Sequence, residues 1–537
     1  GGVASAYVGV NKSINWLNEN TLTWNKTFAE EHDLSLLGGF TMQKNNAEYV
    51  MGSSSNFVND VMLYNNLGAG SVYNKPESNA TQWSLMSYLA RINYTLKHKY
   101  LFSVNARVDG SSRFGTNNKY GFFPSASAGW RISEEAFMEP VKEVISNLKL
   151  RASYGFTGNT EIGVYESLAT LGTSNWILGN QLVSGFFPNK IPNPDLKWER
   201  TGQFDIGLDL GLFNNRLRIT TDYYKKKTTD LLYSVAVPAT SGYQTMLKNI
   251  GSIENQGYEL SIESDNLTGA FSWTTAFNIA FNRNKVLELG GEEYKEMAEG
   301  DGHLKTGSVR RLIVGEPIGV FYGYRFDGIF QNEEECKQQT SSASPIGVGL
   351  RRYKDLNGDG KVDAANDREI LGDANPKFFG GLTNTFAYKG FELNVFLQYS
   401  YGNKILNYNA MELENPTGGQ NAYADMVNRW TPENPSNIYP KATTNRALLV
   451  SDRFIEDGSY LKLKTLSLSY SFPKINLKHI QGLRLYVTGQ NLLTWTKYRG
   501  YDPEVSYRGA STLEAGEDFG GYPQSRTFMF GIKLDIK

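Results

Sequence analysis

Residues 83–96, WSLMSYLARINYTL, and residues 99–109, KYLFSVNARVD, carry apolar side chains at the even-numbered positions from Met86 and from Tyr100 onward. Most of the odd-numbered positions between them are polar. Successive side chains of a β-strand point to opposite faces, so this pattern places one face in an apolar medium and the other in water. The same alternation continues through residues 120–133 and 147–157. A soluble β-sandwich also alternates, but its exposed face rarely repeats so regularly.

The alternation and the turn residues extend over the chain and predict about fifteen strands. Strands of about 9–11 residues joined by alternately short and long connections are typical of a transmembrane β-barrel. The sequence therefore predicts an all-β fold, a transmembrane antiparallel β-barrel. The expected strands lie near residues 14–28, 34–47, 83–96, 99–109, 120–133, 147–157, 199–211, 215–228, 255–265, 270–285, 376–388, 391–401, 459–472, 482–495 and 525–537.

One expected strand contains an irregularity. The apolar positions shift by one residue, from Leu461 and Leu463 to Leu466 and Leu468. One extra residue in a strand has this effect, so we expect a β-bulge near Lys464 and Thr465.

The composition agrees with the wall of such a barrel. Hydrophobic residues make up 40% of the chain and the mean hydropathy is −0.42, as expected when half of each strand faces water. The 32 Tyr and 29 Phe suit aromatic girdles at the membrane interfaces, although they could instead fill a large soluble core. A net charge of −1 gives no support for a nucleic-acid partner. The single cysteine, Cys336, excludes an intrachain disulfide.

The connections between the expected strands alternate in length. Short ones include Lys97–His98 and Lys389–Gly390. In bacterial barrels short turns are periplasmic and long loops face outward, so we expect extracellular long loops and a periplasmic C-terminus. Connections of this length are usually functional. The long ones are residues 48–82, 158–198, 229–254, 286–375, 402–458 and 496–524.

One long connection contains the segment DLNGDGKVD at residues 355–363. Oxygen-bearing residues at positions 1, 3, 5 and 9 with Gly at position 6 match a calcium-binding loop. Position 12 is Asn366, and the expected acid, Asp367, comes one residue later. The spacing predicts a structural Ca²⁺ that fixes a long loop; the alternative is a solvated Asp/Asn/Gly-rich turn without metal. The predicted ligands are Asp355, Asn357, Asp359, the Lys361 carbonyl, Asp363 and Asp367.

No catalytic arrangement stands out. The four histidines are far apart in the sequence, and paired acids lie in polar loops where they are usually solvated. We therefore expect no enzyme. Aromatic side chains of the long loops could stack on sugar rings or peptide side chains, but we expect them to pack the loops against one another. They are Trp176, Phe186, Phe187, Tyr243, Tyr408 and Trp430.

Several short segments occur in one order over nearly the whole chain. They are DGSSRFG (109–115), FPSASAGW (123–130), NPDLKWE (193–199), NQGYEL (255–260), DLNGDG (355–360), NPKF (375–378) and VTGQNLLT (487–494). With these segments the sequence resembles the SusC-type TonB-dependent transporters of the outer membrane.

The resemblance implies a 22-stranded barrel with an internal plug, in agreement with the plugged lumen of barrels of this size. It also implies a SusD-like lipoprotein lid, energy from the TonB–ExbB–ExbD system, and import of oligosaccharides or oligopeptides. Residues 1–537 would then be the C-terminal part of the barrel, surrounded by outer-membrane lipid. An odd number of strands cannot close an antiparallel barrel, so we expect the plug and about seven N-terminal strands on a preceding polypeptide or a separate chain.

Two other functions fit the same pattern. A plug-less SusC-like barrel could serve as a structural subunit of a larger outer-membrane assembly. A secreted carbohydrate-binding β-protein could also alternate, but it would remain in the aqueous phase without detergent. The sequence does not identify the substrate.

Overall fold

The computed structural model describes residues 4–297, 300, 303–304, 306–415, 421–443, 448–472, 480–504, 506–509, 511 and 513–536. The chain divides into two compact units. Unit 1 comprises Gly1–Arg131, Arg151–Phe204 and Lys227–Ser252. Unit 2 comprises Ile132–Leu150, Asp205–Lys226 and Ile253–Lys537.

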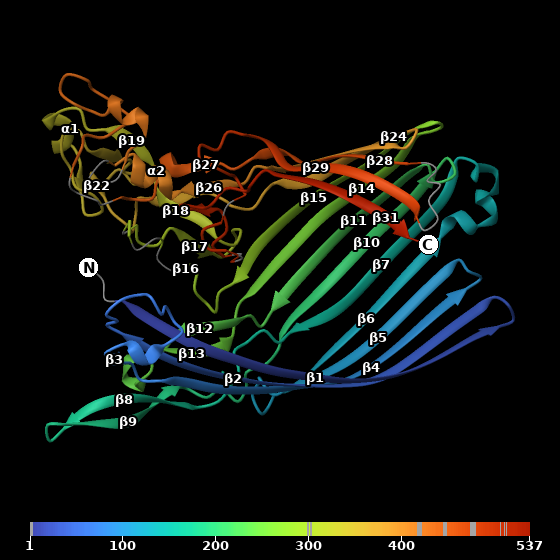
Figure 1. Cartoon of the computed structure of the whole chain (residues 1–537), viewed down its shortest axis with the longest axis horizontal. Coiled ribbons are helices and arrows are strands. Elements are labelled where there is room, and N and C mark those ends of the chain that lie inside the picture. The colour runs from blue at the N-terminus through green and yellow to red at the C-terminus, as the bar shows by residue number, and fades with distance from the viewer. Residues whose placement is uncertain are drawn as a thin grey trace. The chain divides into compact units, whose positions relative to one another are not determined.

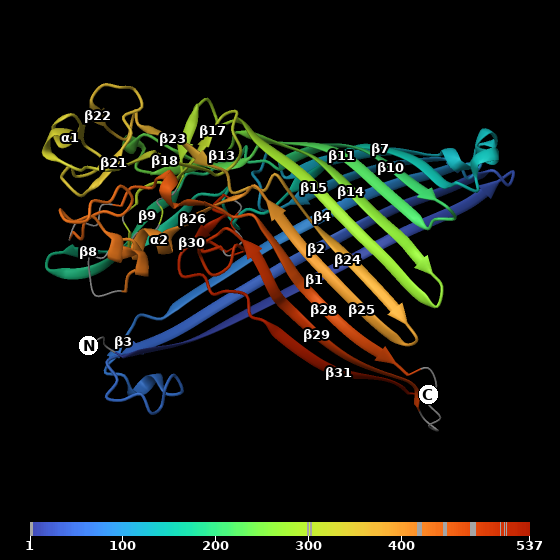
Figure 2. The same ribbon diagram turned by 90° about the horizontal axis from the view of Figure 1, so that it is seen from above.

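The principal element is one sixteen-stranded sheet. All of its strands except β3 (Val72–Tyr73) follow one another in chain order, which confirms the expected fifteen. Figure 1 shows β4, β5 and β6 as neighbours in unit 1, and Figure 2 shows β28, β29 and β31 in unit 2. The ordered strands are β1 (Ser5–Phe28), β2 (His32–Ser55), β4 (Glu77–Leu96), β5 (Tyr100–Ser111), β6 (Tyr120–Arg131), β7 (Ile145–Asn159), β10 (Glu199–Leu212), β11 (Leu217–Thr229), β14 (Ser252–Thr268), β15 (Phe271–Glu288), β24 (Phe378–Tyr388), β25 (Phe391–Tyr401), β28 (Tyr460–Ser471), β29 (Ile480–Thr496) and β31 (Thr527–Ile536).

The two faces of the sheet differ as the alternation predicts. In unit 1 the apolar residues pair across strands, Ile92 with Val104 and Tyr94 with Phe102. Ile92, Phe102 and Val104 each expose between 47% and 53% of their surface. The opposite face carries a polar ladder in which the Arg107 Nε donates to Asp109 at 2.7 Å. A continuous exposed apolar face of this extent is typical of a surface that contacts lipid.

The short connections are tight hairpins. Lys97 and His98 have φ of 53° and 55° between β4 and β5, and Lys389 and Gly390 have φ of 45° and 89° between β24 and β25. Positive φ at both central residues is the geometry of type I′ turns, whose twist matches that of antiparallel strands. Two residues join β24 to β25 and three, Lys97–Lys99, join β4 to β5, so short turns fix the register of both strand pairs.

The first expected long connection, residues 48–82, is wrong in its bounds. β2 continues to Ser55 and β4 begins at Glu77, and the register between them runs without a shift from His32↔Leu96 to Met51↔Glu77. Backbone pairing does not need an apolar side chain, so the strands extend past the point where the alternation ends. The connection is correspondingly shorter.

The expected bulge is confirmed. Residue 464 has no partner in the ladder on either side of β28: Leu463 and Thr465 pair with Leu397 and Phe396 in β25. On the other side they pair with Leu493 and Gln490 in β29. Because of this extra residue Leu461 and Leu468 lie on the same, exposed face although their numbers differ in parity.

The connections between strands carry smaller sheets. Unit 1 has the hairpins β8 (Thr170–Leu178)–β9 (Gln181–Lys190) and β12 (Leu232–Ala236)–β13 (Thr245–Asn249). No helix in the described part of the chain is both long and apolar enough to span a membrane. Unit 2 adds β16 (Tyr294–Glu296), β17 (Arg310–Ile313), β18 (Val320–Tyr324), β19 (Phe326–Ile329), α1 (Glu333–Lys337), β20 (Thr340–Ser341), β21 (Arg351–Tyr353), β22 (Lys361–Val362), β23 (Arg368–Gly372), β26 (Lys404–Asn407), α2 (Tyr408–Leu413), β27 (Ile455–Asp457) and β30 (Glu517–Asp518).

Deletion of Lys464 should prevent correct folding, because it moves Leu466 and Leu468 to the face now occupied by Ser467 and Ser469. Lys464→Ala is the matched control, since it keeps the bulge and removes the ion pair of Lys464 with Glu504 (3.1 Å), whose carboxylate still pairs with Lys462. Folding is measured by heat-modifiable mobility in gels and by protease resistance. A deletion variant that folds like the control would contradict this account of the bulge.

Candidate functional site

The long connections of unit 2 fold together. The described residues of 289–377, 402–459 and 497–526 are called the loop body here, and Figure 1 shows their short strands and helices. They bury a core of their own, as expected for connections of this length. This core consists of Leu304, Val309, Phe321, Leu406, Tyr408, Ala410, Met411, Leu448, Val450 and Phe454.

All three connections meet at one buried ion pair. The Arg310 Nε donates to the Glu517 Oε1 at 2.8 Å, and the two side chains are 2% and 1% exposed. The other guanidinium nitrogens of Arg310 donate to the carbonyls of Gly319 and Ala515. The Tyr408 hydroxyl donates to the other Glu517 oxygen at 3.3 Å. Burial, together with the Glu517 charge, raises the pKa of Tyr408, so the hydroxyl remains a donor.

A second network surrounds Glu414, whose side chain is fully buried. Its carboxylate accepts hydrogen bonds from Arg453 at 2.8 Å and from Arg499 at 2.9 Å. Arg499 also pairs with Glu456 at 2.8 Å. Two arginines therefore satisfy a buried acid and connect residues 402–459 to residues 497–526.

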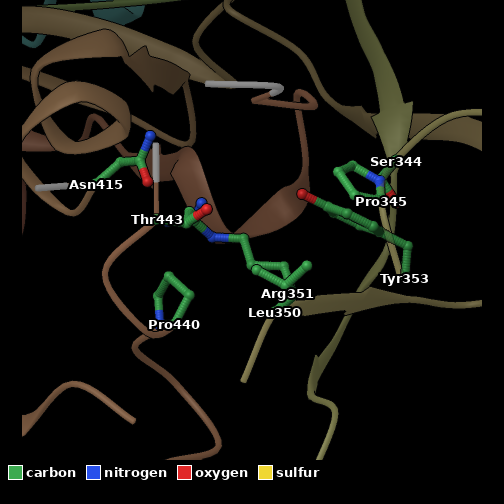
Figure 3. Close-up of a pocket in the computed structure, with 8 residues that line it drawn as sticks. All are labelled: Ser344, Pro345, Leu350, Arg351, Tyr353, Asn415, Pro440 and Thr443. Atoms are coloured by element: carbon green, nitrogen blue, oxygen red, sulfur yellow. The ribbon is translucent and has the colours of Figure 1, made fainter. Parts of the chain in front are cut away.

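A pocket lies in the loop body beside this network (Figure 3). It is small, with a volume of about 30 Å³ open to water, and it opens to solvent. Figure 3 shows the Arg351 side chain extending towards Thr443, with Tyr353 on another wall. Proline and leucine side chains supply apolar walls. The lining residues are Ser344, Pro345, Leu350, Arg351, Tyr353, Asn415, Pro440 and Thr443.

The structure places the predicted calcium ligands in one curled segment. Asp355 accepts hydrogen bonds from the backbone N–H groups of Gly358 and Gly360, both at 2.7 Å. Gly358 and Gly360 have φ of 76° and 81°, which explains the need for glycine at these positions. Asp359 accepts from the Lys361 N–H at 2.8 Å, and the Asn357 amide donates to Asp359 at 2.9 Å.

The remaining carboxylates of this segment also contact its own atoms. Asp367 is fully buried and accepts from the N–H groups of Leu356 at 2.8 Å and Asp363 at 2.7 Å. Asp363 pairs with the Lys361 ammonium at 3.1 Å, and this contact, with the Asn366 N–H, holds the pKa of Asp363 below its ordinary value. Over the described residues, no three or more His, Cys, Asp or Glu side chains converge on a point where a metal would sit.

The expectation that the loop aromatics pack against the loops holds for some of them. Tyr408 is fully buried, and the Trp430 Nε1 donates to Gln331 at 3.0 Å. Trp176 and Phe186, on the β8–β9 hairpin, are instead 56% and 75% exposed.

Sequence reasoning missed the residues that build the loop body. Arg310 and Glu517 are 207 residues apart, and Arg351 and Glu414 occur in polar stretches without periodicity. A double arginine at 310–311 within a short apolar segment was the one local signal, since charged residues are rarely buried without a partner.

The family described as "TonB dependent receptor-like, beta-barrel" matches residues 2–492. The chain belongs to this family. Its alternating strands and exposed apolar face agree with an outer-membrane barrel.

Individual relatives agree with the family assignment. "TonB-dependent receptor P3" of Formosa agariphila is 41% identical over 97% of this chain and 52% of its own length. "TonB-dependent receptor SusC" of Bacteroides thetaiotaomicron is 32% identical over 85% of this chain and 44% of its own length. The structure of "the RagAB peptide transporter" superposes with a TM-score of 0.81 at 28% identity, covering 99% of this chain and 56% of that one. The chain thus spans about half the length of the curated relatives it matches.

Glu517→Gln should destabilise the loop body by about 3–5 kcal/mol, because it leaves the buried Arg310 charge without a carboxylate. Glu263→Gln, which breaks the exposed Arg218–Glu263 pair (3.0 Å), is the control and should cost about 0–1 kcal/mol. Proteolysis of residues 289–377 under native conditions reports the stability of the loop body. Equal proteolysis of the two variants would contradict the central role given to the Arg310–Glu517 pair.

Proposed function

We propose that this chain is the C-terminal barrel part of a SusC-type importer that takes up oligosaccharides or oligopeptides across the outer membrane. The observation that carries the proposal is the family match over residues 2–492, together with a sheet that has an exposed apolar face. The role is transport and not catalysis. The names of two relatives support it: one is a receptor called SusC, and the other is called a peptide transporter.

The partners of this importer follow from the same assignment. They are a SusD-like lipoprotein at the outer surface and the TonB–ExbB–ExbD system as the source of energy. The long connections would face the exterior and the C-terminus the periplasm, because short hairpins are typical of the periplasmic side.

We also propose that further strands and a plug complete the barrel. The ordered strands run from β1 to β31 and are odd in number, so the two end strands have the same direction. An antiparallel barrel closes by pairing its first and last strands in opposite directions. Open edges in lipid would leave backbone groups unpaired at several kcal/mol each. The greater length of the relatives supports additional segments.

The alternative is a plug-less barrel that acts as a structural subunit of a larger assembly. The two functions differ in their need for energy. Import through a plugged barrel requires TonB, whereas a scaffold requires only assembly into the membrane.

Deletion of the gene should abolish uptake of one class of labelled oligomer, and loss of TonB should abolish it equally while the protein stays assembled in the membrane. Uptake of labelled oligosaccharides and oligopeptides by intact cells is the measurement, with surface detection of the protein as the control for assembly. Uptake that persists without TonB, or a deletion that disrupts a membrane assembly and leaves uptake unchanged, favours the structural subunit.

We further propose that the segment 355–367 binds Ca²⁺ and fixes the connection that contains it. The spacing of oxygen-bearing residues and the curled backbone support this. The ion would be held by Asp355, Asn357, Asp359, the Lys361 carbonyl and Asp363. Asp367 would complete the coordination shell. Lys361 would have to release Asp363 for that carboxylate to bind.

Calcium should protect residues 289–377 from protease, and Asp359→Ala should remove this protection. Asp327→Ala is the matched control, since Asp327 lies in the same connection and pairs with Arg352 at 3.0 Å. Protection that is equal in calcium and in chelator would count against the metal.

A further inference from the structure

Unit 1 contains a cavity between its two small hairpins. Residues of β9, β12 and β13 line it, together with the connection between β12 and β13 and with Glu166. The volume open to water is about 510 Å³. Ligand pockets usually have volumes of about 300–1,000 Å³, so this cavity has the size of a binding site for a small molecule or one part of a larger one.

Hydrogen bonds connect the segments that line this cavity. Asn193, which follows β9, is buried, and its amide donates to the Leu247 carbonyl of β13 at 2.9 Å. The Asn193 N–H donates to the Ser167 carbonyl at 3.1 Å. Between β12 and β13 the Val237 N–H donates to the Gln244 carbonyl, also at 3.1 Å. These contacts hold the walls in place without a ligand, which lowers the entropic cost of binding.

Two aromatic side chains, Phe187 and Tyr243, belong to the lining. Phe187 pairs with Gly172 across the hairpin, and a Cβ atom added to Gly172 would lie 2.6 Å from the Phe187 ring. The ring therefore covers the glycine, yet 40% of the Phe187 residue remains exposed. Covering the glycine explains one side of the ring and leaves the exposed part available to stack on the apolar face of a ligand.

Several lining side chains are polar and uncharged. In the part of the chain that the structure describes, the exposed side chains of Asn189, Gln244 and Thr245 make no hydrogen bond. Amide and hydroxyl groups both donate and accept hydrogen bonds. They therefore match a ligand whose own groups do both, as sugar hydroxyls do.

The charges at the cavity cancel. The Lys190 ammonium pairs with the Glu166 carboxylate, and both side chains line the cavity. The hairpin segments 170–190 and 232–249 contain no Asp or Glu, and their charged residues are Lys190 and Lys248. A surface with so little net charge does not attract an acidic or a basic ligand in particular, so it favours a neutral one.

We infer that this cavity binds a neutral sugar unit of an oligosaccharide. The two aromatic rings would contact the C–H face of the sugar, and the three uncharged polar side chains would bind its hydroxyl groups. A peptide fits less well, because extended peptides add to a free strand edge and Pro188 in β9 has no N–H for such pairing. A role of this site in capturing an imported oligomer rests on the proposed import function, whereas sugar binding does not.

The experiment applies the purified full-length protein to arrays of neutral glycans, acidic glycans and peptides. Wild type should bind at least one neutral glycan saturably. Phe187→Ala should weaken this binding by about tenfold, because the stacking surface is lost. Phe186→Ala is the matched control and should leave binding unchanged: Phe186 is the neighbouring residue, points to the opposite face of β9 and is 75% exposed.

A second variant keeps the test valid if Phe187→Ala disturbs the hairpin. Gln244→Ala removes an exposed side chain that has no hydrogen bond within the described residues, so folding should be unaffected. It should weaken glycan binding by about threefold, as expected for the loss of one hydrogen bond. Protease resistance of residues 170–190 reports the state of the hairpin, and where Phe187→Ala lowers it, Gln244→Ala alone decides.

The outcomes separate the site from the import function. Wild-type binding that is confined to acidic glycans or peptides, or absent from all arrays, overturns the proposal, and so does neutral-glycan binding that is unchanged in both variants. Uptake of the bound glycan by intact cells is measured separately. Binding without uptake contradicts import and leaves the site, whereas uptake of a neutral glycan without binding on the arrays contradicts the site and leaves import.

Discussion

The constraint on which this structure depends is that a strand in hydrocarbon can satisfy its backbone N–H and C=O groups only through neighbouring strands. β2 meets this condition on both sides: its register with β1 is unbroken from Ser5↔Ser55 to Phe28↔His32, and its register with β4 is unbroken from His32↔Leu96 to Met51↔Glu77. Once the register is fixed, the side-chain pattern follows, because each residue must then face either lipid or water. Tight turns such as the one at Lys97–His98 and the bulge at Lys464 keep this assignment intact.

Outside the strands this constraint no longer applies, and the connections are stabilised differently. Their backbone cannot rely on a regular ladder, so side chains supply the missing partners: Arg310 donates to the carbonyls of Gly319 and Ala515 as well as to Glu517. Such buried charges are retained only where nearly all of their hydrogen bonds are made. Among the described residues of the loop body, the Arg351 Nε and the Glu296 Oε2 depart from this rule, since both are buried without a hydrogen-bond partner.

The sequence predicted those structural features that depend on residues close together in the chain. Period-two alternation predicted the strands, two-residue turns predicted the hairpins, and a change of parity predicted the bulge at Lys464, because each of these depends on neighbouring residues. The ends of β2 and β4 were missed because residues 52–55 and 77–82 are small or polar and look like a loop in the sequence. The Arg310–Glu517 and Glu414–Arg499 pairs join residues more than 80 positions apart and have no periodic pattern. Charged residues in a loop look solvated until the fold brings their partners together.

The connection formed by residues 497–526 shows how the two kinds of structure are joined. Near one end, Asp502 and Glu504 accept hydrogen bonds from the buried Lys462 of β28, at 2.6 and 2.5 Å. The ion pairs hold the pKa values of both acids below their ordinary range, although burial opposes this shift. Near the other end, Glu517 pairs with Arg310 in the loop body.

A segment held at both ends by desolvated ion pairs cannot move as a lid without separating at least one of them, at a cost of several kcal/mol. This energetic cost keeps the described residues of 497–526 in a fixed position between β28 and the loop body of unit 2. Exposed segments without buried charge pairs of this kind are better suited to movement. The β8–β9 hairpin of unit 1 is one of them: its Ile177, Leu182 and Phe186 side chains are largely exposed, and a two-stranded hairpin by itself is only marginally stable in water.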